Sequence, residues 1–87
     1  MELSVDERLA YEAVKEIQEI KNGNGQRPDF AVLFEVYNYL RPELSEGFEG
    51  KILQALRLLY RKGIIEFHKT VNGVPMFGII NKNQKIA

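Results

Sequence analysis

The side chains best able to bind an anion gather in one segment, residues 51–62. Lys51, Gln54, Arg57 and Arg61 recur there at helical spacing. The other side of the same predicted helix is apolar and is formed by Ile52, Leu53, Ala55, Leu56, Leu59 and Tyr60. One face of this helix is therefore expected to pack against the protein, while the other presents positive charge to a partner.

The charged residues divide unequally between the two halves of the chain. Residues 1–47 contain ten acids and five bases, a balance of −5, and residues 48–87 contain two acids and seven bases, a balance of +5. Although the whole chain is neutral, such an asymmetry hints at a polyanionic partner. The alternative is that an acidic helix and a basic helix simply solvate one another's surroundings.

Residue types that perform catalysis or bind metals are scarce. His68 is the only histidine, and the chain contains no cysteine. Glu12, Glu16 and Glu19 share part of one helical face, but without a histidine beside them they are typical of a solvated surface and not of a metal site. We therefore expect no enzymatic activity, no metal and no cofactor.

The sequence lacks the features of a secreted or membrane protein. Its N-terminus, MELSVDE, is acidic where a signal peptide would be basic. The longest unbroken apolar run, residues 30–34, is far shorter than a bilayer span, and the absence of cysteine removes the disulfides typical of oxidising compartments. These observations predict a cytoplasmic protein without membrane contact.

Two helices are predicted before the basic one. Ser4 and Glu7 form a capping-box pattern, which places the first helix over residues 5–21, with Val5, Leu9, Ala13, Ile17 and Ile20 on its packing face. Asp29 is a candidate N-cap for a second helix over residues 30–40, although the apolar density of this segment also suits a buried strand.

The second predicted helix is apolar on more than one side. Its core face is expected to contain Phe30, Leu33, Phe34, Tyr37 and Leu40. Val32, Val36 and Tyr39 then remain to be covered. Either the first helix or a hairpin of the same protomer covers these three side chains, or they form the surface for a homodimer or a protein partner.

The basic helix is expected to end near Lys62, because Gly63 can take the left-handed conformation that terminates a helix. Residues 64–71 and 74–80 are rich in β-branched and aromatic side chains, which predicts two strands. Asn72-Gly73 between them favours a two-residue type I′ turn. In that register Val71 faces Val74, and Thr70 faces Pro75 in a pair that needs no N–H from proline.

The segment Leu59-Tyr60-Arg61-Lys62-Gly63-Ile64-Ile65 resembles the end of the third helix of winged helix-turn-helix proteins. Asn72-Gly73 followed by Met76-Phe77-Gly78-Ile79 is similar to their wing and its return strand. The resemblance covers about residues 5–80. It implies an α+β fold, with three helices followed by a two-stranded antiparallel β-hairpin wing, in a single domain over residues 1–80. Residues 81–87 are expected to form a polar tail that frays.

The same resemblance implies a function. Most members of this superfamily regulate transcription, with the third helix in the major groove of double-stranded DNA. Carried onto this chain, Lys51, Gln54 and Arg57 would face DNA, and Arg61 and Lys69 would meet phosphates. The expected function is that of a small transcription regulator or a phage or plasmid accessory factor. The alternative is a winged-helix module that binds another protein and no DNA.

Overall fold

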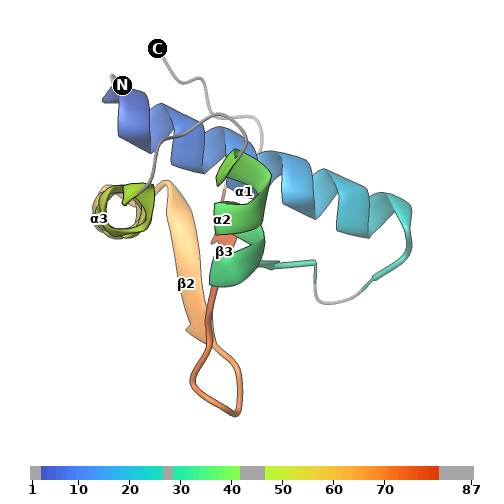
Figure 1. The fold of residues 1–87 in the computed structure, drawn as a ribbon. Helices are drawn as coiled ribbons and strands as arrows, with labels where there is room; N and C mark the ends of the chain where they lie inside the picture. Colours follow the sequence, from blue (N-terminus) through green and yellow to red (C-terminus); the bar gives the residue numbers. More distant parts are fainter. Residues whose placement is uncertain (1–2, 27–28, 42–46, 81–87) are drawn as a thin grey trace.

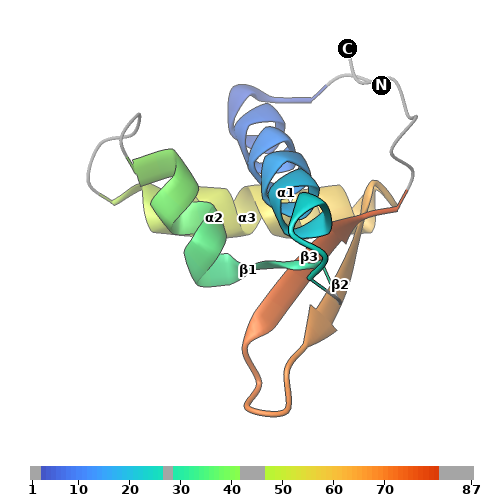
Figure 2. The same cartoon turned by 90° about the vertical axis from the view of Figure 1, so that its right-hand side faces the viewer.

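The computed structural model describes residues 3–26, 29–41 and 47–80, so the predicted tail over residues 81–87 lies outside the described residues. The fold is α+β, with three helices and one three-stranded antiparallel sheet (Figure 1). Its elements are α1 (Val5–Gly23), β1 (Ala31–Val32), α2 (Leu33–Leu40), α3 (Phe48–Arg61), β2 (Ile65–Lys69) and β3 (Pro75–Ile79). In two perpendicular views the turn between β2 and β3 extends away from the helices (Figure 2).

The predicted capping box at the start of α1 is confirmed. The Ser4 hydroxyl accepts a hydrogen bond from the Glu7 N–H at 3.1 Å, and the Ser4 N–H donates to the Glu7 carboxylate at 3.0 Å. The packing face differs from the prediction, because Val5 and Ile20 are exposed. The buried side chains of α1 are Glu7, Ala10, Tyr11, Ala13, Val14, Ile17 and Gln18.

The second helix begins later than predicted, at Leu33, and its N-cap is Val32 instead of Asp29. The Glu35 carboxylate accepts a hydrogen bond from the Val32 N–H at 2.8 Å, which satisfies one of the free donors at the helix start. Lys21 on α1 donates to the same carboxylate at 2.5 Å. This one acidic side chain therefore fixes the start of α2 to the end of α1.

The packing face of α2 differs from the predicted one. Leu33, Val36, Tyr37 and Leu40 follow the helical spacing of a packing face and contact the core or lie within it. Phe34, which was expected in the core, is 63% exposed. That prediction was wrong because Val36 packs inward, and Phe34, which lies about 160° around the helix from Val36, then faces outward.

The third helix ends as predicted. Gly63 has a φ of +75°, the Gly63 N–H donates to the Tyr60 carbonyl and the Ile64 N–H donates to the Leu59 carbonyl, both at 3.0 Å. These two bonds form a Schellman motif, which satisfies carbonyls that the helix would otherwise leave free. Ile64 is then fully buried at the start of the hairpin.

The sheet has three strands, so the predicted two-stranded hairpin is incomplete. The strand order is β1-β3-β2, with Ala31 opposite Phe77 and Val32 opposite Met76. The strand β1 was assigned to the second helix in our prediction, because two residues are too few to show the alternation that identifies a strand. The hairpin is therefore one part of a larger sheet.

The turn between β2 and β3 has three residues, 71–73, instead of two. The Thr70 N–H donates to the Val74 carbonyl and the Gly73 N–H donates to the Thr70 carbonyl, both at 2.9 Å. Gly73 has a φ of +80°, whereas no described residue other than glycine has a positive φ. Because a type I′ turn requires a positive φ at Asn72 as well, the predicted turn type was wrong.

The extra turn residue shifts the strand pairing by one position. Pro75 faces Lys69, and the predicted pairs of Thr70 with Pro75 and of Val71 with Val74 do not form. The ladder bond from the Thr70 N–H to the Val74 carbonyl places Pro75 in the next, non-hydrogen-bonded pair. Pro75 therefore interrupts no hydrogen bond between the strands, as predicted, although the strands pair in a different register.

A buried side chain of α1 connects that helix to the middle strand of the sheet. The Gln18 side chain accepts a hydrogen bond from the Ile79 N–H at 2.9 Å, at a position on β3 beyond the end of β1. Phe30 lies over Gly78, where an added Cβ would come within 2.7 Å of the ring. The Phe30 ring also stacks on the His68 ring, with the two ring centroids 4.8 Å apart.

The hydrophobic core lies where α1, α3 and the sheet meet. It draws buried side chains from all three helices and all three strands, including Val14, Val36, Leu56, Ile65 and Phe77. None of the helices in the described residues has the length and hydropathy that crossing a bilayer requires. Packing on this core leaves one side of α3 facing outward, at the left of Figure 1.

Candidate functional site

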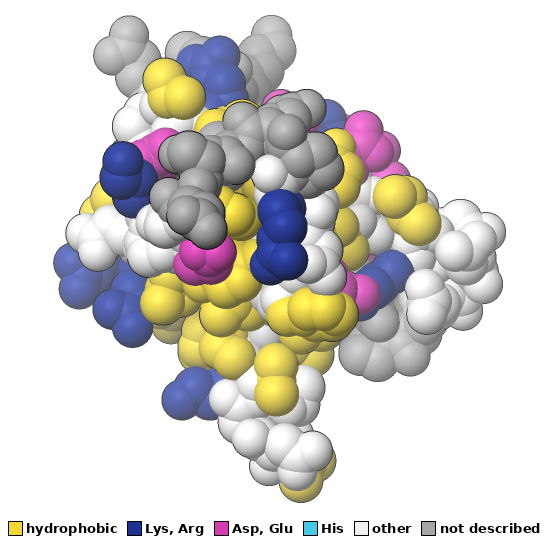
Figure 3. Space-filling view, viewed as in Figure 1, with side chains coloured by type: hydrophobic (Ala, Val, Ile, Leu, Met, Phe, Trp, Pro, Cys, Tyr) yellow, Lys and Arg dark blue, Asp and Glu magenta, His cyan; other side chains and the backbone are white. Residues whose placement is uncertain are grey.

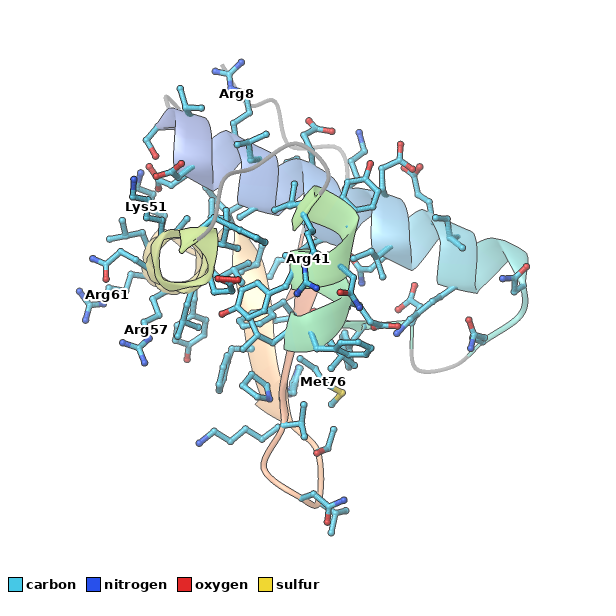
Figure 4. The ribbon with its side chains drawn as sticks, in the orientation of Figure 1. Arg8, Arg41, Lys51, Arg57, Arg61 and Met76 are labelled. Carbon is cyan, nitrogen blue, oxygen red and sulfur yellow. The ribbon has the colours of Figure 1, made fainter. Side chains whose placement is uncertain are left out.

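The exposed side of α3 contains the four predicted polar residues. Lys51, Gln54, Arg57 and Arg61 are all exposed, and in Figure 4 the three cationic side chains among them point away from the protein. Their spacing places them on adjoining parts of one side of the helix, opposite the buried residues Ile52, Leu56 and Leu59. We call these four residues the α3 polar face.

Lys62, the cation that follows α3, already forms an ion pair within the protein. Lys62 donates a hydrogen bond to the Glu7 carboxylate at 2.6 Å, which ties the end of α3 to the start of α1. The ion pair with Lys62 and the backbone hydrogen bond from Ser4 lower the pKa of the Glu7 carboxyl below its ordinary value, against the effect of burial. Lys62 is therefore less available to an outside anion than the α3 polar face.

Lys69, the fifth predicted binding residue, lies at the end of β2 and is exposed. The fold brings it to the same groove as Arg57, although the two residues belong to different elements. This groove has a volume of about 350 Å³ and runs between α3 and the hairpin. Of the predicted site residues, Arg57 and Lys69 are thus brought together across a surface depression.

The walls of this groove, which we call the α3–hairpin groove, are mainly apolar. Its lining includes Leu33 from α2, Leu53 and Tyr60 from α3, and Phe67 and Pro75 from the hairpin. The hydrophobic side chains gathered below α3 are visible in Figure 3. Tyr60 was predicted to be in the core but is 54% exposed, with its ring 5.9 Å from that of Phe67.

The sequence did not predict this groove, because its walls come from three separate elements. Leu53 and Tyr60 both belong to the predicted apolar stripe, and helical spacing alone does not show which edge of a stripe the rest of the fold covers. The only charged side chains among its described lining residues are Arg57 and Lys69. The groove therefore combines an apolar surface with positive charge.

The predicted partner surface of Val32, Val36 and Tyr39 does not exist as one surface. Val36 is fully buried in the core, and Val32 lies in β1 as the N-cap of α2. Tyr39 alone is clearly exposed, at 44%. The physical reason is that α2 packs with Val36 inward, which leaves Phe34, about 160° around the helix, outside.

His68 is held in place by contacts with two neighbouring side chains. Its Nε2 atom lies 2.6 Å from the Glu66 carboxylate, and its ring stacks on Phe30. Both Glu66 and His68 point to the face of the sheet opposite Phe67, because side chains alternate along a strand. Among the described residues, no group of three or more potential metal ligands lies close enough together to hold an ion.

No protein-family model matches the sequence, and no curated protein matches it. Functional inference for this chain therefore rests on the α3 polar face and the α3–hairpin groove themselves.

Proposed function

We propose that this chain is a small winged-helix DNA-binding protein, a transcription regulator or a phage or plasmid accessory factor, that places α3 in the major groove. The observation that carries the proposal is the α3 polar face, where three cations and one amide are exposed on one side of a single helix. Glu49, the acid at the start of α3, lies about 140° around the helix from Gln54, so it does not interrupt this face.

The side chains of the α3 polar face suit the chemistry of DNA. Arg57 can donate two hydrogen bonds to a guanine edge, and Gln54 can pair with an adenine edge in the same bidentate manner. Lys51, Arg61 and Lys69 are suited to phosphate oxygens, which fix the position of the helix without reading sequence. The proposal therefore gives base recognition to the middle of the face and phosphate binding to its ends.

The element order also supports the winged-helix assignment. Three helices precede the hairpin, and the hairpin packs beside α3, so that Lys69 lies near the helix proposed to enter the groove. From Lys51 to Arg61 the helix rises about 15 Å, at about 1.5 Å per residue. This length corresponds to only about four base pairs of DNA, so one protomer should bind weakly and two copies on adjacent half-sites would bind more tightly.

The test compares two double variants that lose the same charge. Arg57→Ala with Arg61→Ala removes two cations from the α3 polar face, whereas Arg8→Ala with Arg41→Ala removes two exposed cations from α1 and from the end of α2 (Figure 4). By fluorescence anisotropy with mixed-sequence duplex DNA at low salt, we expect the first variant to bind at least about tenfold more weakly than the wild type. The second should bind within about threefold of the wild type.

Two results would contradict the proposal. One is the absence of detectable DNA binding by the wild-type protein at low salt, where contacts with phosphates are strongest. The other is an equal loss of affinity in both double variants, because that outcome would indicate attraction by net charge and not by α3. Circular dichroism of each variant checks that the fold is retained.

The alternative is a protein-binding module without DNA binding, with the acidic first helix or the apolar second helix as its contact surface. The second helix is the weaker candidate, because Val36 is fully buried while Tyr39 is exposed. We favour DNA because the exposed cations of the α3 polar face suit a polyanion.

A further inference from the structure

The α3–hairpin groove is a feature that DNA binding by the α3 polar face does not explain. Its apolar walls come from α2, α3 and the hairpin, and a DNA phosphate or base edge would gain little from them. At about 350 Å³ it falls at the small end of the volumes typical of ligand pockets. Such pockets combine apolar walls with a few polar groups that fix the orientation of the ligand.

The charged side chains of the groove favour a negatively charged ligand. Arg57 on α3 and Lys69 on β2 are the only charged side chains among the described lining residues, and both are cations. They belong to different elements on either side of the depression. An anion in the groove would therefore meet positive charge from both elements, while its apolar body contacts Leu53, Tyr60 and Phe67.

The length of the groove along α3 limits the size of its ligand. Along α3 it extends over the eight residues from Leu53 to Tyr60, a rise of about 10 Å. An α-helix with its side chains is about 10–12 Å wide, so the groove is no longer than a helix is broad. One compact apolar group fits this space, whereas the face of an extended helix would overhang it.

We propose that the α3–hairpin groove binds a small aromatic or short aliphatic carboxylate, with the apolar body against Tyr60 and Phe67 and the carboxylate between Arg57 and Lys69. This inference goes beyond DNA binding and does not depend on it. Because Arg57 also belongs to the α3 polar face, a bound carboxylate would compete with DNA for that side chain. The groove would then act as an effector site.

Naphthoate is a suitable probe, and its amide analogue, naphthamide, is a neutral control of the same shape. In a titration followed by two-dimensional NMR, naphthoate should saturate and should shift the backbone amides of Leu53, Arg57, Tyr60, Phe67 and Lys69. Naphthamide should bind at least about threefold more weakly, because it lacks the charge. Shifts centred on another part of the protein, or equal affinity for the two compounds, would overturn the proposal.

Matched variants test the two cations and the aromatic wall. Arg57→Gln and Lys69→Gln should each weaken naphthoate binding by about threefold to fivefold, as expected for exposed charge pairs, whereas Lys51→Gln removes an equal charge outside the groove and should change it less than twofold. Tyr60→Ala should weaken binding by at least about fivefold, and Tyr39→Ala, an exposed tyrosine on α2, should not.

A short peptide with phenylalanine between glutamates provides the last comparison. If this peptide shifts the groove amides and naphthoate does not, the groove is a protein-docking surface and the small-ligand assignment is wrong. All the charge variants change exposed side chains, so each of them should keep the fold and remain informative even if Tyr60→Ala is unstable.

Discussion

At the scale of single residues, Glu7 does more than cap a helix. Its carboxylate receives the Ser4 N–H and the Lys62 ammonium group, so it joins the start of α1 to the end of α3. Glu7 is the only buried acid among the described residues, and the groups it contacts satisfy its charge. A buried carboxylate with such partners is stabilising only while it is ionised.

The first prediction follows from this ion pair. The lowered pKa of Glu7 means that its contribution to stability is complete above the ordinary carboxyl value and is lost as the pH falls through the lowered pKa. Glu7→Gln should reduce the free energy of unfolding by about 1–2 kcal/mol near pH 7, since Lys62 can still turn to water. Urea unfolding should show that this difference shrinks towards zero at strongly acidic pH.

The control for Glu7 is Glu12→Gln, which changes an exposed acid on the same helix. It should alter the free energy of unfolding by less than about 0.5 kcal/mol at any pH. A difference between wild type and Glu7→Gln that stays constant from neutral to acidic pH would mean that the charge of Glu7 contributes nothing.

A second prediction at this scale concerns Gly78. A Cβ at this position would lie 2.7 Å from the Phe30 ring and 3.1 Å from the Gln18 amide nitrogen, so Gly78→Ala should cost about 1–3 kcal/mol of unfolding free energy. Gly50→Ala is the matched control, because a Cβ there meets nothing within 4 Å inside α3. It should stabilise the protein by about 0.5–1 kcal/mol. Thermal or urea unfolding measures the change in unfolding free energy for both variants. Equal changes in the two variants would contradict the close approach of Phe30 to Gly78.

At the scale of elements, the sequence predicted what depends on local contacts. The capping box at Ser4 and the end of α3 at Gly63 follow from residues within a few positions of each other, and both are confirmed. The exposure of Lys51, Gln54, Arg57 and Arg61 follows from helical spacing in the same way. Whether these residues bind DNA remains a prediction.

The errors arose where distant segments decide the structure. Ala31 and Val32 form a strand because β3, more than forty residues later, offers its edge, and their own sequence cannot show this. That strand delays the start of α2, and the packing of this helix on the assembled fold buries Val36 and leaves Phe34 exposed. The α3–hairpin groove was missed for the same reason, because it exists only once α2, α3 and the hairpin are assembled.

The hairpin turn gives a prediction that separates the two turn types. In the three-residue turn only Gly73 has a positive φ, so Gly73→Ala should cost about 1 kcal/mol of unfolding free energy, while Asn72→Ala should change it by less than about 0.5 kcal/mol. In a type I′ turn both substitutions would be costly. A loss of similar size in the two variants, measured by urea unfolding, would favour the two-residue turn.

At the scale of the whole molecule, the unequal distribution of charge sets how binding depends on salt. The second half of the chain has the excess of positive charge, and four of its cations, Lys51, Arg57, Arg61 and Lys69, lie on or beside α3. The exposed side of α1, with Glu12, Glu16 and Glu19, contributes charge of the opposite sign. Although the net charge of the chain is zero, one of its surfaces is therefore suited to a polyanion.

If Lys51, Arg61 and Lys69 each meet a phosphate, the logarithm of the DNA association constant should fall with the logarithm of salt concentration with a slope of about −3. The double variant of Arg57 and Arg61 should reduce the magnitude of this slope by about 1, because only Arg61 of the two is assigned to a phosphate and each lost contact removes about 0.9. Anisotropy titrations over a series of salt concentrations measure both slopes. A slope near zero in the wild type would exclude phosphate contacts as the source of affinity.

The hydrogen bond from Ile79 to Gln18 also bears on how the sheet ends beneath α1. On its β1 side, β3 is paired as far as Phe77, and the Ile79 N–H lies past the end of β1. This donor is buried, so without an acceptor it would cost about 1–3 kcal/mol. The Gln18 side chain supplies the acceptor from within the protein. A glutamine on the first helix thus takes the place of the strand residue that β1 is too short to provide.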